Sequence, residues 1–227
     1  MNFEQALSVV LTADGSKTIF NPRIGENYHS KHGALQESKH VFIQEGLAHF
    51  LKDKDLQQVS ILEVGFGTGL NFLLSADFCK REYVRLNYLG IEAFPLDNLL
   101  LQQTGYEHYV CESIWSAFTN KYAEAIQQTT AIGPYCDLKI AHIELVNFQS
   151  DTLFDMIYFD AFSAIRQPEM WSEQAIEYVC QYLKLGGVFV TYAITGHLKR
   201  ALKKIGFVVE KAPGAPGKRE MLRATKR

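Results

Sequence analysis

Residues 61–75 read ILEVGFGTGLNFLLS, and this stretch decides the fold class. An apolar run of strand length at 59–64 leads into three alternating glycines, and residues 70–78 then have helical spacing. A strand, a glycine turn and a helix in this order begin an open parallel α/β sheet, in which ligands bind at the carboxyl ends of the strands. The stretch therefore predicts a parallel α/β fold with a ligand site at this turn.

The spacing of the glycines indicates which ligand the turn takes. Gly65, Gly67 and Gly69 form GxGxG after Glu63, whereas dinucleotide loops use GxGxxG and a P-loop needs a GK[ST] that is absent here. An acid just before the first glycine also disfavours a pyrophosphate. The pattern ExGxGxG is typical of class I S-adenosylmethionine methyltransferases, whose loop faces the methionine part while the acid helps to hold its ammonium side. Glu92, at the end of the next expected strand, is placed to bind the ribose hydroxyls; a tight turn without ligand is the alternative.

The rest of the chain alternates apolar runs with segments of helical spacing. We expect strands at 7–11, 17–20, 59–64, 86–91, 138–143, 154–159, 188–192, 207–210 and 219–224, the first two as a hairpin and the last two as an antiparallel edge. We expect helices at 41–51, 70–78, 113–128 and 197–205, and a further helix with Pro95 in its first turn. Another helix should begin after Ser172, which caps it, run to about Leu183 and be closed by Gly186 and Gly187. Residues 21–38 are expected to be irregular.

The expected architecture is a Rossmann-like class I α/β fold in one main domain. We assign residues 1–50 to an N-terminal hairpin and a segment that packs on the main domain, and residues 51–227 to the methyltransferase domain. The chain has no internal repeat and no linker long enough to divide it further.

The composition excludes several classes of protein. The 227 residues are 47% hydrophobic and contain only six Pro, which excludes a disordered or collagen-like chain. No apolar run approaches the roughly 20 residues of a membrane helix, and the N-terminus lacks the basic and apolar regions of a signal peptide. The four cysteines are scattered, with no CxxC. We therefore expect a cytoplasmic protein with reduced thiols, no metal and no membrane partner.

Charge is distributed unevenly along the chain. From Leu198 onward ten basic residues accompany two acidic ones, so this segment carries +8 and the remainder −10. An acidic body with a basic end is expected where one face meets a polyanion. The alternative is a solvated surface helix followed by a frayed tail.

A second candidate site follows the nearly continuous apolar run at 154–159. Asp160 ends this run, and the aromatic and Pro-containing stretch 168–171 (PEMW) follows soon after. Because a buried central strand delivers its last residue to the same crevice as the glycine loop, Asp160 is a candidate site residue. A helix cap or turn residue is the alternative.

These stretches resemble the methyltransferase domain of the MnmC family. Besides 61–75, the resemblance is carried by HGALQESKHVF (32–42), YFDAFS (158–163), PEMW (168–171), GGVFVTY (186–192), LKRALKKIGF (198–207) and PGKREML (216–222), in order from about residue 5 to 224. It implies an enzyme that uses S-adenosylmethionine to convert the 5-aminomethyl group of wobble uridine-34 in tRNA to 5-methylaminomethyl-(2-thio)uridine. Longer members carry a second, flavin-dependent domain. Because no second glycine fingerprint is present here, we expect methylation only, without FAD.

The resemblance also implies roles for individual residues. Those that match the family's donor site are Gly65, Gly67, Gly69 and Glu92. Asp160 matches the aspartate of the catalytic-site D-(A/G)-F motif, and Glu144 falls about where the family has an Asp near the adenine. Ala164 stands where the family usually has Pro, a departure that removes no functional group.

The implied chemistry places a primary amine beside a sulfonium donor. Such an amine is mostly protonated at neutral pH, as lysine is with a pKa of about 10.4, so we expect Asp160 to hold and orient it and to receive its proton. Partial burial should raise the pKa of Asp160 for this role. Phe162, Trp171 and Tyr192 are candidates to stack on the extruded uracil, with ordinary packing as the alternative for each.

The basic C-terminal segment then has a partner, the anticodon stem-loop of tRNA. We expect phosphate contacts from Lys199, Arg200, Lys218 and Arg219, and no obligate protein partner is evident. Two other functions stay open: a methyltransferase for a small-molecule amine or hydroxyl, and a non-catalytic RNA-binding protein with a vestigial site. An NAD-dependent oxidoreductase is disfavoured by the glycine spacing.

Overall fold

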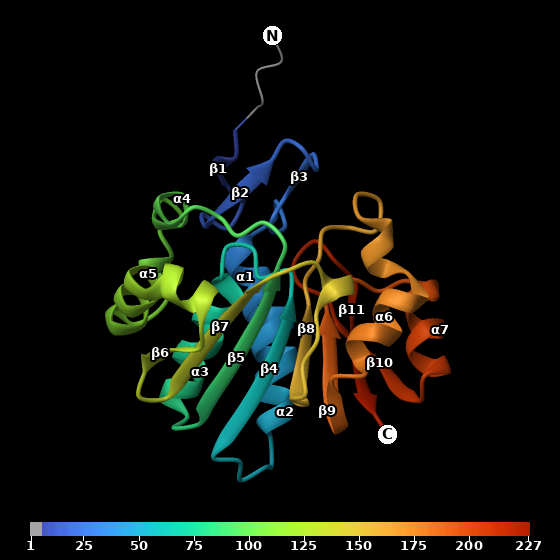
Figure 1. Ribbon diagram of the computed structural model, residues 1–227. Coiled ribbons are helices and arrows are strands. Elements are labelled where there is room, and N and C mark those ends of the chain that lie inside the picture. Colours follow the sequence, from blue (N-terminus) through green and yellow to red (C-terminus); the bar gives the residue numbers. More distant parts are fainter. Residues whose placement is uncertain (1–5) are drawn as a thin grey trace.

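The computed structural model describes residues 6–227. An eight-stranded sheet in the order β10-β11-β9-β8-β4-β5-β7-β6 forms the body, and a three-stranded sheet, β1-β2-β3, lies beyond the carboxyl ends of its central strands (Figure 1). The strands are β1 (Ser8–Leu11), β2 (Lys17–Asn21), β3 (Glu26–Asn27), β4 (Gln58–Val64), β5 (Arg85–Glu92), β6 (Thr130–Gly133), β7 (Cys136–His142), β8 (Phe154–Phe159), β9 (Leu183–Thr191), β10 (Phe207–Pro213) and β11 (Glu220–Lys226).

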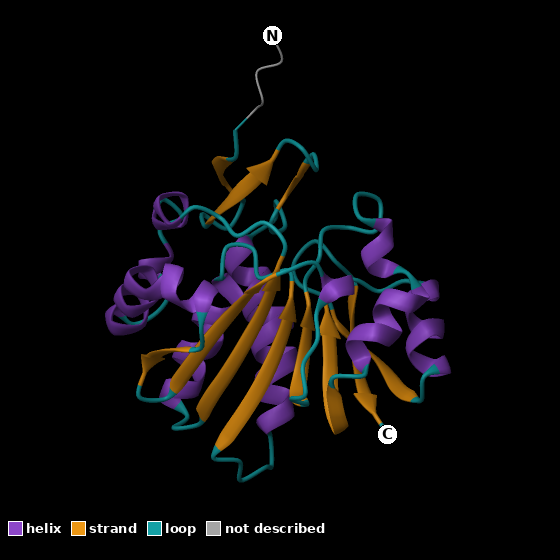
Figure 2. Cartoon of the chain, in the orientation of Figure 1, coloured by secondary structure: helices purple, strands orange, loops and turns teal. Residues whose placement is uncertain are grey.

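Helices cover both faces of the large sheet (Figure 2). The α-helices are α1 (Ala34–Ser38), α2 (His49–Leu51), α3 (Leu70–Arg81), α4 (Asn98–Gln102), α5 (Glu112–Gln127), α6 (Glu173–Cys180) and α7 (Gly196–Lys204). A π-helix, η1 (Lys39–Ala48), joins α1 to α2, and the 3-10 turns are η2 (Tyr106–His108), η3 (Leu145–Asn147) and η4 (Pro168–Trp171). The expected boundary at residue 50 therefore falls inside α2.

The middle of the large sheet is parallel. β8 pairs with β4 and β9, and β5 pairs with β4 and β7, all in parallel register. β5 extends the sheet on one side of β4 and β8 on the other, so the strand order reverses at β4. Such a reversal opens a crevice at the carboxyl ends of the strands. The glycine loop after β4 and Asp160 after β8 both lie at this edge, as the sequence predicts.

Strand β8 shows how the two faces of the sheet are buried. Met156 and Tyr158 pack into the core formed with α1, η1, α3 and α5, while Ile157 and Phe159 pack into the core formed with α6 and α7. Successive side chains of a strand point to opposite faces, so a strand buried on both sides has a nearly continuous apolar run, which in β8 only Asp155 interrupts. The prediction made for 154–159 is confirmed.

One expected helix is too long. The cap is as predicted, since Ser172 Oγ accepts a hydrogen bond from the Ala175 N–H, but α6 ends at Cys180. Leu183 instead begins β9, where it pairs with Phe154. The pair Gly186-Gly187 lies within a register shift of this ladder, and Gly186 has a φ of +74°. The two glycines therefore allow a β-bulge-like irregularity inside strand β9 and do not terminate a helix.

Two smaller expectations are wrong as well, and one strand was missed. Pro95 does not open a helix: α4 begins at Asn98, because the Asp97 carboxylate caps it by accepting from the Leu99 N–H. The range 21–38 contains β3 and α1, so the helical run begins at residue 34 rather than 41. The edge strand β6 was not expected; it pairs antiparallel with β7.

The two ends of the chain follow the predicted pattern more closely. β1 and β2 pair antiparallel as a hairpin, and β10 and β11 also pair antiparallel. β11 lies inside the edge, because it pairs with β9 on its other side. All four cysteines are free. In residues 6–227 no helix is both long enough and apolar enough to cross a membrane.

Candidate active site

The glycine loop lies directly against the chain that follows β8. Gly65, Gly67 and Gly69 all have positive φ values, of +85°, +51° and +75°. A Cβ built on Gly65 would come within 2.6 Å of the Asp160 carbonyl oxygen, so no side chain fits there. The same conformation directs the Gly65 and Phe66 N–H groups to the Ile91 carbonyl at 3.0 and 3.1 Å. The glycines therefore let the loop pack between β5 and β8 without a side-chain clash.

Glu92 connects the end of β5 to this loop. Its carboxylate accepts hydrogen bonds from the Gly67 N–H at 2.8 Å and from the Phe94 N–H at 2.9 Å. Burial raises the pKa of Glu92, and these two N–H groups oppose the rise. Glu144, expected near an adenine, is exposed at the start of η3, just after β7 at the same edge of the sheet.

Beneath the loop, one amide joins two acids. The Asn71 side-chain nitrogen donates to Glu63 Oε1 at 2.9 Å and to Asp160 Oδ2 at 2.8 Å. Glu63 is fully buried; burial, and then the neighbouring Asp160 carboxyl, raise its pKa well above the usual range. Asn71 was not predicted, although it follows the loop directly in the quoted stretch and lies in the first turn of α3.

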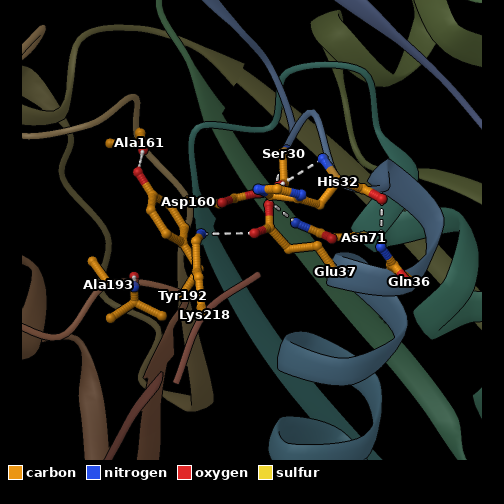
Figure 3. Close-up of polar contacts among 11 residues, drawn as sticks. Ser30, His32, Gln36, Glu37, Asn71, Asp160, Ala161, Tyr192, Ala193 and Lys218 are labelled. Atoms are coloured by element: carbon orange, nitrogen blue, oxygen red, sulfur yellow. Dashed lines mark hydrogen bonds and ion pairs between the residues drawn. The ribbon is translucent and has the colours of Figure 1, made fainter. Parts of the chain in front are cut away.

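Asp160 has the pKa expected of a proton acceptor at neutral pH. Burial, and then the negative charge of Glu37, raise the pKa of Asp160 to about 7, while the Asn71 hydrogen bond and Lys218 hold it down. The rise through burial confirms the direction expected from the sequence. Figure 3 shows Asp160 together with Asn71 and Glu37, and Lys218 reaching Glu37 from the side of Tyr192.

The three aromatic candidates have different surroundings. Phe162 is half-buried, and its ring packs edge-on against Tyr28 with centroids 4.9 Å apart. Trp171 is 6% exposed and its Nε1–H donates to the Phe162 carbonyl at 2.7 Å, so most of its ring belongs to the core. Tyr192 is half-buried, and its hydroxyl donates to the Ala161 carbonyl at 2.9 Å.

A cavity of about 790 Å³ opens beside these aromatic residues. Its walls come from the loop after Asp160, from the start of α6 and from the chain between β9 and α7. Trp171 and Tyr192 line it together with Ile165, whose side chain is almost fully exposed. The cavity is therefore mainly apolar and adjoins the loop that carries Asp160.

The N-terminal sheet contributes residues that the sequence did not suggest. Tyr28 covers the glycine loop so closely that a Cβ on Gly67 would lie 2.8 Å from its ring. Glu26 accepts hydrogen bonds from both the N–H and the hydroxyl of Ser163, at 3.1 and 2.8 Å. No local pattern could reveal these residues, because Gly67 lies 39 positions from Tyr28 and Ser163 lies 137 positions from Glu26.

The basic candidates do not form one group. Arg200 and Arg219 are exposed and Lys199 is half-buried. Lys218 instead turns inward and pairs with Glu37 at 2.7 Å. The expected basic surface thus retains Lys199, Arg200 and Arg219, whereas Lys218 lies beside the acid cluster.

The arrangement fits a cationic donor such as S-adenosylmethionine. Glu63, Glu92 and Asp160 surround the glycine loop, and burial raises the pKa of each. A nearby positive charge would offset that cost, and the donor carries both a sulfonium and an ammonium group. Glu63 Oε2 is also buried without a hydrogen-bond partner among the residues that the structure describes.

Comparisons with known proteins agree with this geometry. A family model described as S-adenosyl-L-methionine-dependent methyltransferase matches residues 109–227, just over half of the chain. The bifunctional protein MnmC of tRNA 5-methylaminomethyl-2-thiouridine biosynthesis is 30% identical over 215 residues in Magnetococcus marinus, and 31% over 218 residues in Paracidovorax citrulli. Each match covers 91% of this chain but 32% and 34% of the relative. The chain thus spans about a third of the length of these curated relatives.

A solved structure shows the same fold. The MnmC2 protein of Aquifex aeolicus superposes with a TM-score of 0.76 at 22% identity, over 99% of this chain and 72% of that one. These matches confirm the resemblance to MnmC that the sequence motifs indicate. They also confirm the predicted class I architecture.

Proposed function

This chain belongs to the S-adenosyl-L-methionine-dependent methyltransferase family, and we propose that it methylates the 5-aminomethyl group of wobble uridine-34 in tRNA. The product is 5-methylaminomethyl-(2-thio)uridine. The observation that carries the proposal is the position of Asp160, whose carboxyl has a pKa of about 7 and whose backbone lies against the glycine loop. The loop that follows it forms one wall of a largely apolar cavity. Its MnmC relatives belong to tRNA 5-methylaminomethyl-2-thiouridine biosynthesis, which supports tRNA as the substrate.

The donor is assigned to the glycine loop. The loop backbone at Gly65, Gly67 and Gly69 would face its methionine part, and Glu63 lies beneath the ammonium side. Glu92 would exchange its backbone N–H partners for the two ribose hydroxyls, and Glu144 is our candidate near the adenine. The bound donor supplies an electrophilic methyl group, a chemistry that needs no flavin and no metal.

Asp160 acts on the amine. A primary aliphatic ammonium has a pKa of about 10.4, so it must lose a proton before its nitrogen can act as a nucleophile. With a pKa of about 7, the Asp160 carboxylate can hold the ammonium by a charge-assisted hydrogen bond and accept its proton as the new bond forms. Much of the acceleration comes from holding the nitrogen in line with the methyl group.

The cavity beside Asp160 is assigned to the extruded base. Tyr192 and Trp171 line the cavity, and Tyr192 is our candidate to stack on the base. Phe162 lies at the edge of the cavity, next to Ser163, and packs against Tyr28. Lys199, Arg200 and Arg219 would contact phosphates of the anticodon stem-loop, since their charges are not committed to the acid cluster. Chemistry on a base requires it to leave its stack, so a pocket of this kind is expected.

The test is transfer of labelled methyl from S-adenosylmethionine to tRNA from cells that lack this activity. Nucleoside mass spectrometry should show 5-methylaminomethyl-uridine increasing as 5-aminomethyl-uridine decreases, and Asp160→Ala should abolish the change. Donor binding without transfer to tRNA would contradict the proposal. Transfer to small-molecule amines in its place would identify the enzyme as a small-molecule methyltransferase.

A further inference from the structure

We infer that the ion pair between Glu37 and Lys218 is a positioning device for methyl transfer, which fixes Tyr192 and sets the electrostatic field in which Asp160 works. This inference rests on the proposed function for its kinetic consequences. It assigns Lys218 a different role from the phosphate contact expected from the sequence.

The ion pair joins two parts of the chain that are 181 positions apart. Glu37 lies in α1, and Lys218 lies in the turn between β10 and β11. Lys218 Nζ is 2.7 Å from Glu37 Oε2, and the two side chains are only 32% and 9% exposed. The second oxygen, Glu37 Oε1, accepts from the Ser30 N–H at 3.1 Å. Both charges are thus held in place, unlike those of a solvated surface pair.

The turn that carries Lys218 is built to face inward. Gly217 has a φ of +89°, and a Cβ there would lie 2.6 Å from the His32 ring. The Lys218 N–H donates to the Ala215 carbonyl at 2.8 Å, which closes the turn. His40 reaches the same turn through a 2.7 Å contact with the Pro213 carbonyl. A glycine at 217 therefore lets the turn rest on the N-terminal segment and directs Lys218 toward Glu37.

Lys218 also contacts Tyr192. Its ammonium lies 3.9 Å from the centre of the Tyr192 ring, within the range of a cation–π contact. The Tyr192 hydroxyl donates to the carbonyl of Ala161, the residue after Asp160. Figure 3 shows this chain of contacts, from Glu37 through Lys218 and Tyr192 to the loop after β8. Through it, Lys218 acts on the backbone that holds Asp160.

The pair has a second effect on Asp160, which is electrostatic. Glu37 raises the pKa of Asp160 and Lys218 lowers it. Burial keeps His29 neutral by lowering its pKa to about 4, so Lys218 is the cation that balances Glu37. The other groups that interact with Asp160 are the acid Glu63 and the phenols of Tyr88 and Tyr192, whose pKa values burial raises. They add no positive charge, so removing either member of the pair should change how Asp160 titrates.

The two single variants should shift Asp160 in opposite directions. Lys218→Met leaves Glu37 unbalanced, so the pKa of Asp160 should rise. If the rise is about one unit, the carboxylate fraction at pH 7 falls from about half to about a tenth, which predicts a fivefold loss of kcat/KM that recovers near pH 9. Glu37→Gln should lower the pKa. The double variant should restore a value near that of the wild type, and Lys218→Arg should retain it.

The direct experiment is an NMR titration of protein with 13C-labelled aspartate carboxyl groups, with the Asp160 signal assigned by its loss in Asp160→Asn. This readout needs no substrate, so it decides the inference even where methyl transfer to tRNA fails. The matched control is Lys184→Met, because Lys184 pairs with Asp155 at 2.8 Å at the other end of β8. That variant should leave the Asp160 titration unchanged.

The kinetic experiment separates positioning from phosphate binding. If Lys218 is a positioning residue, Lys218→Met should shift the pH profile of methyl transfer. The KM for tRNA and its salt dependence should then stay close to those of the wild type. A higher KM for tRNA with a weaker salt dependence and an unchanged pH profile would overturn the inference. An identical Asp160 titration in wild type, both single variants and the double variant would also overturn it.

Discussion

The two ends of β8 carry the same residue in opposite circumstances. Asp155, at the start of the strand, accepts from the Ser60 N–H at 2.8 Å, the Ser60 hydroxyl at 2.7 Å and Lys184 at 2.8 Å. Although burial acts against them, these bonds lower its pKa below the usual value. Asp160, past the other end, accepts one side-chain hydrogen bond, from Asn71, and its pKa rises to about 7.

The difference separates a structural carboxylate, Asp155, from the carboxylate that we propose to be reactive, Asp160. Asp155 has its charge compensated by groups of the protein itself, so it stabilises the fold and has little capacity left for a ligand. Asp160 keeps unused acceptor capacity next to the glycine loop, and its burial costs the folded state free energy. Both aspartates can be read from the sequence. The difference between their pKa values depends on residues elsewhere in the chain, namely Ser60, Lys184, Asn71 and Glu37.

The largest expected effect is on catalysis. Asp160→Asn should reduce methyl transfer by about 10²–10⁴-fold, because the amide cannot accept the proton of the amine. Asp155→Asn should retain transfer and lose about 1–3 kcal/mol of unfolding free energy, since it weakens three hydrogen bonds. Single-turnover kinetics and urea denaturation of both variants check this. Equal kinetic losses in the two variants would remove the distinction between the two ends of β8.

The glycine loop beside Asp160 should be nearly as sensitive. In Gly65→Ala the new Cβ would meet the Asp160 carbonyl at 2.6 Å in a left-handed backbone, so donor affinity should fall by about 100-fold or more. The matched control is Gly133→Ala in β6, where no described atom lies within 4 Å of the added Cβ. Calorimetric titration with S-adenosylmethionine measures both. Unchanged affinity in Gly65→Ala would place the donor elsewhere.

The two aspartates should also give opposite pH dependences of stability. Asp160 has a folded pKa of about 7 against an ordinary value of 3.8, so between these values the native state binds more protons than the unfolded state. The unfolding free energy should therefore fall as pH rises through this window, by about 1–3 kcal/mol. Asp155 contributes stability that is present above its ordinary pKa and is lost only as pH falls through its lowered folded value.

Urea denaturation at pH 5 and pH 8 tests this difference. Asp160→Asn should reduce the decline seen in the wild type, whereas Asp155→Asn should leave it unchanged and lower stability at both pH values. Glu63 and Glu92 also have raised pKa values, so part of the decline should persist in every variant. A decline of the same size in wild type and Asp160→Asn would show that Asp160 does not titrate as described.

The smallest effect is expected on tRNA binding at the basic surface. Reversing Lys199 and Arg200 to Glu should weaken tRNA binding about tenfold at moderate salt and reduce the slope of log K against log salt by about 2. Lys52→Glu is the control, because Lys52 is exposed after α2, where the chain leads to the start of β4. Filter binding across a salt series measures both. Equal slopes for the two variants would contradict a role for α7 in phosphate contacts.

The parallel core of the sheet could be predicted from the sequence, and so could the carboxyl ends of β4 and β8 as the candidate site. The apolar run before Asp160 and the glycine spacing after β4 are local signals, and both elements form where expected. The errors fall where a distant partner decides the structure. Leu183 joins β9 because Phe154 offers a strand partner, and Asp97 begins α4 by capping it in place of Pro95.

The same reason explains the gaps in the predicted site. Glu37 lies in a stretch that was expected to be irregular, and Lys218 was expected to contact phosphates. Both predictions rested on neighbouring residues only. Their contact spans 181 positions, and neither residue has a local pattern that indicates the other. Tyr28 and Asn71 belong to the same category, since each acts through residues on other elements.

The position of β11 has a consequence for how the chain folds during synthesis. β10 leaves the ribosome before β11, yet its place in the sheet exists only after β11 has paired with β9. Until residues 220–226 emerge, β9 is an open edge and β10 has no partner strand, which is a form prone to aggregation. A nascent chain stalled before Glu220 therefore lacks two strands of the sheet rather than one, together with the cation that balances Glu37 if the stall precedes Lys218.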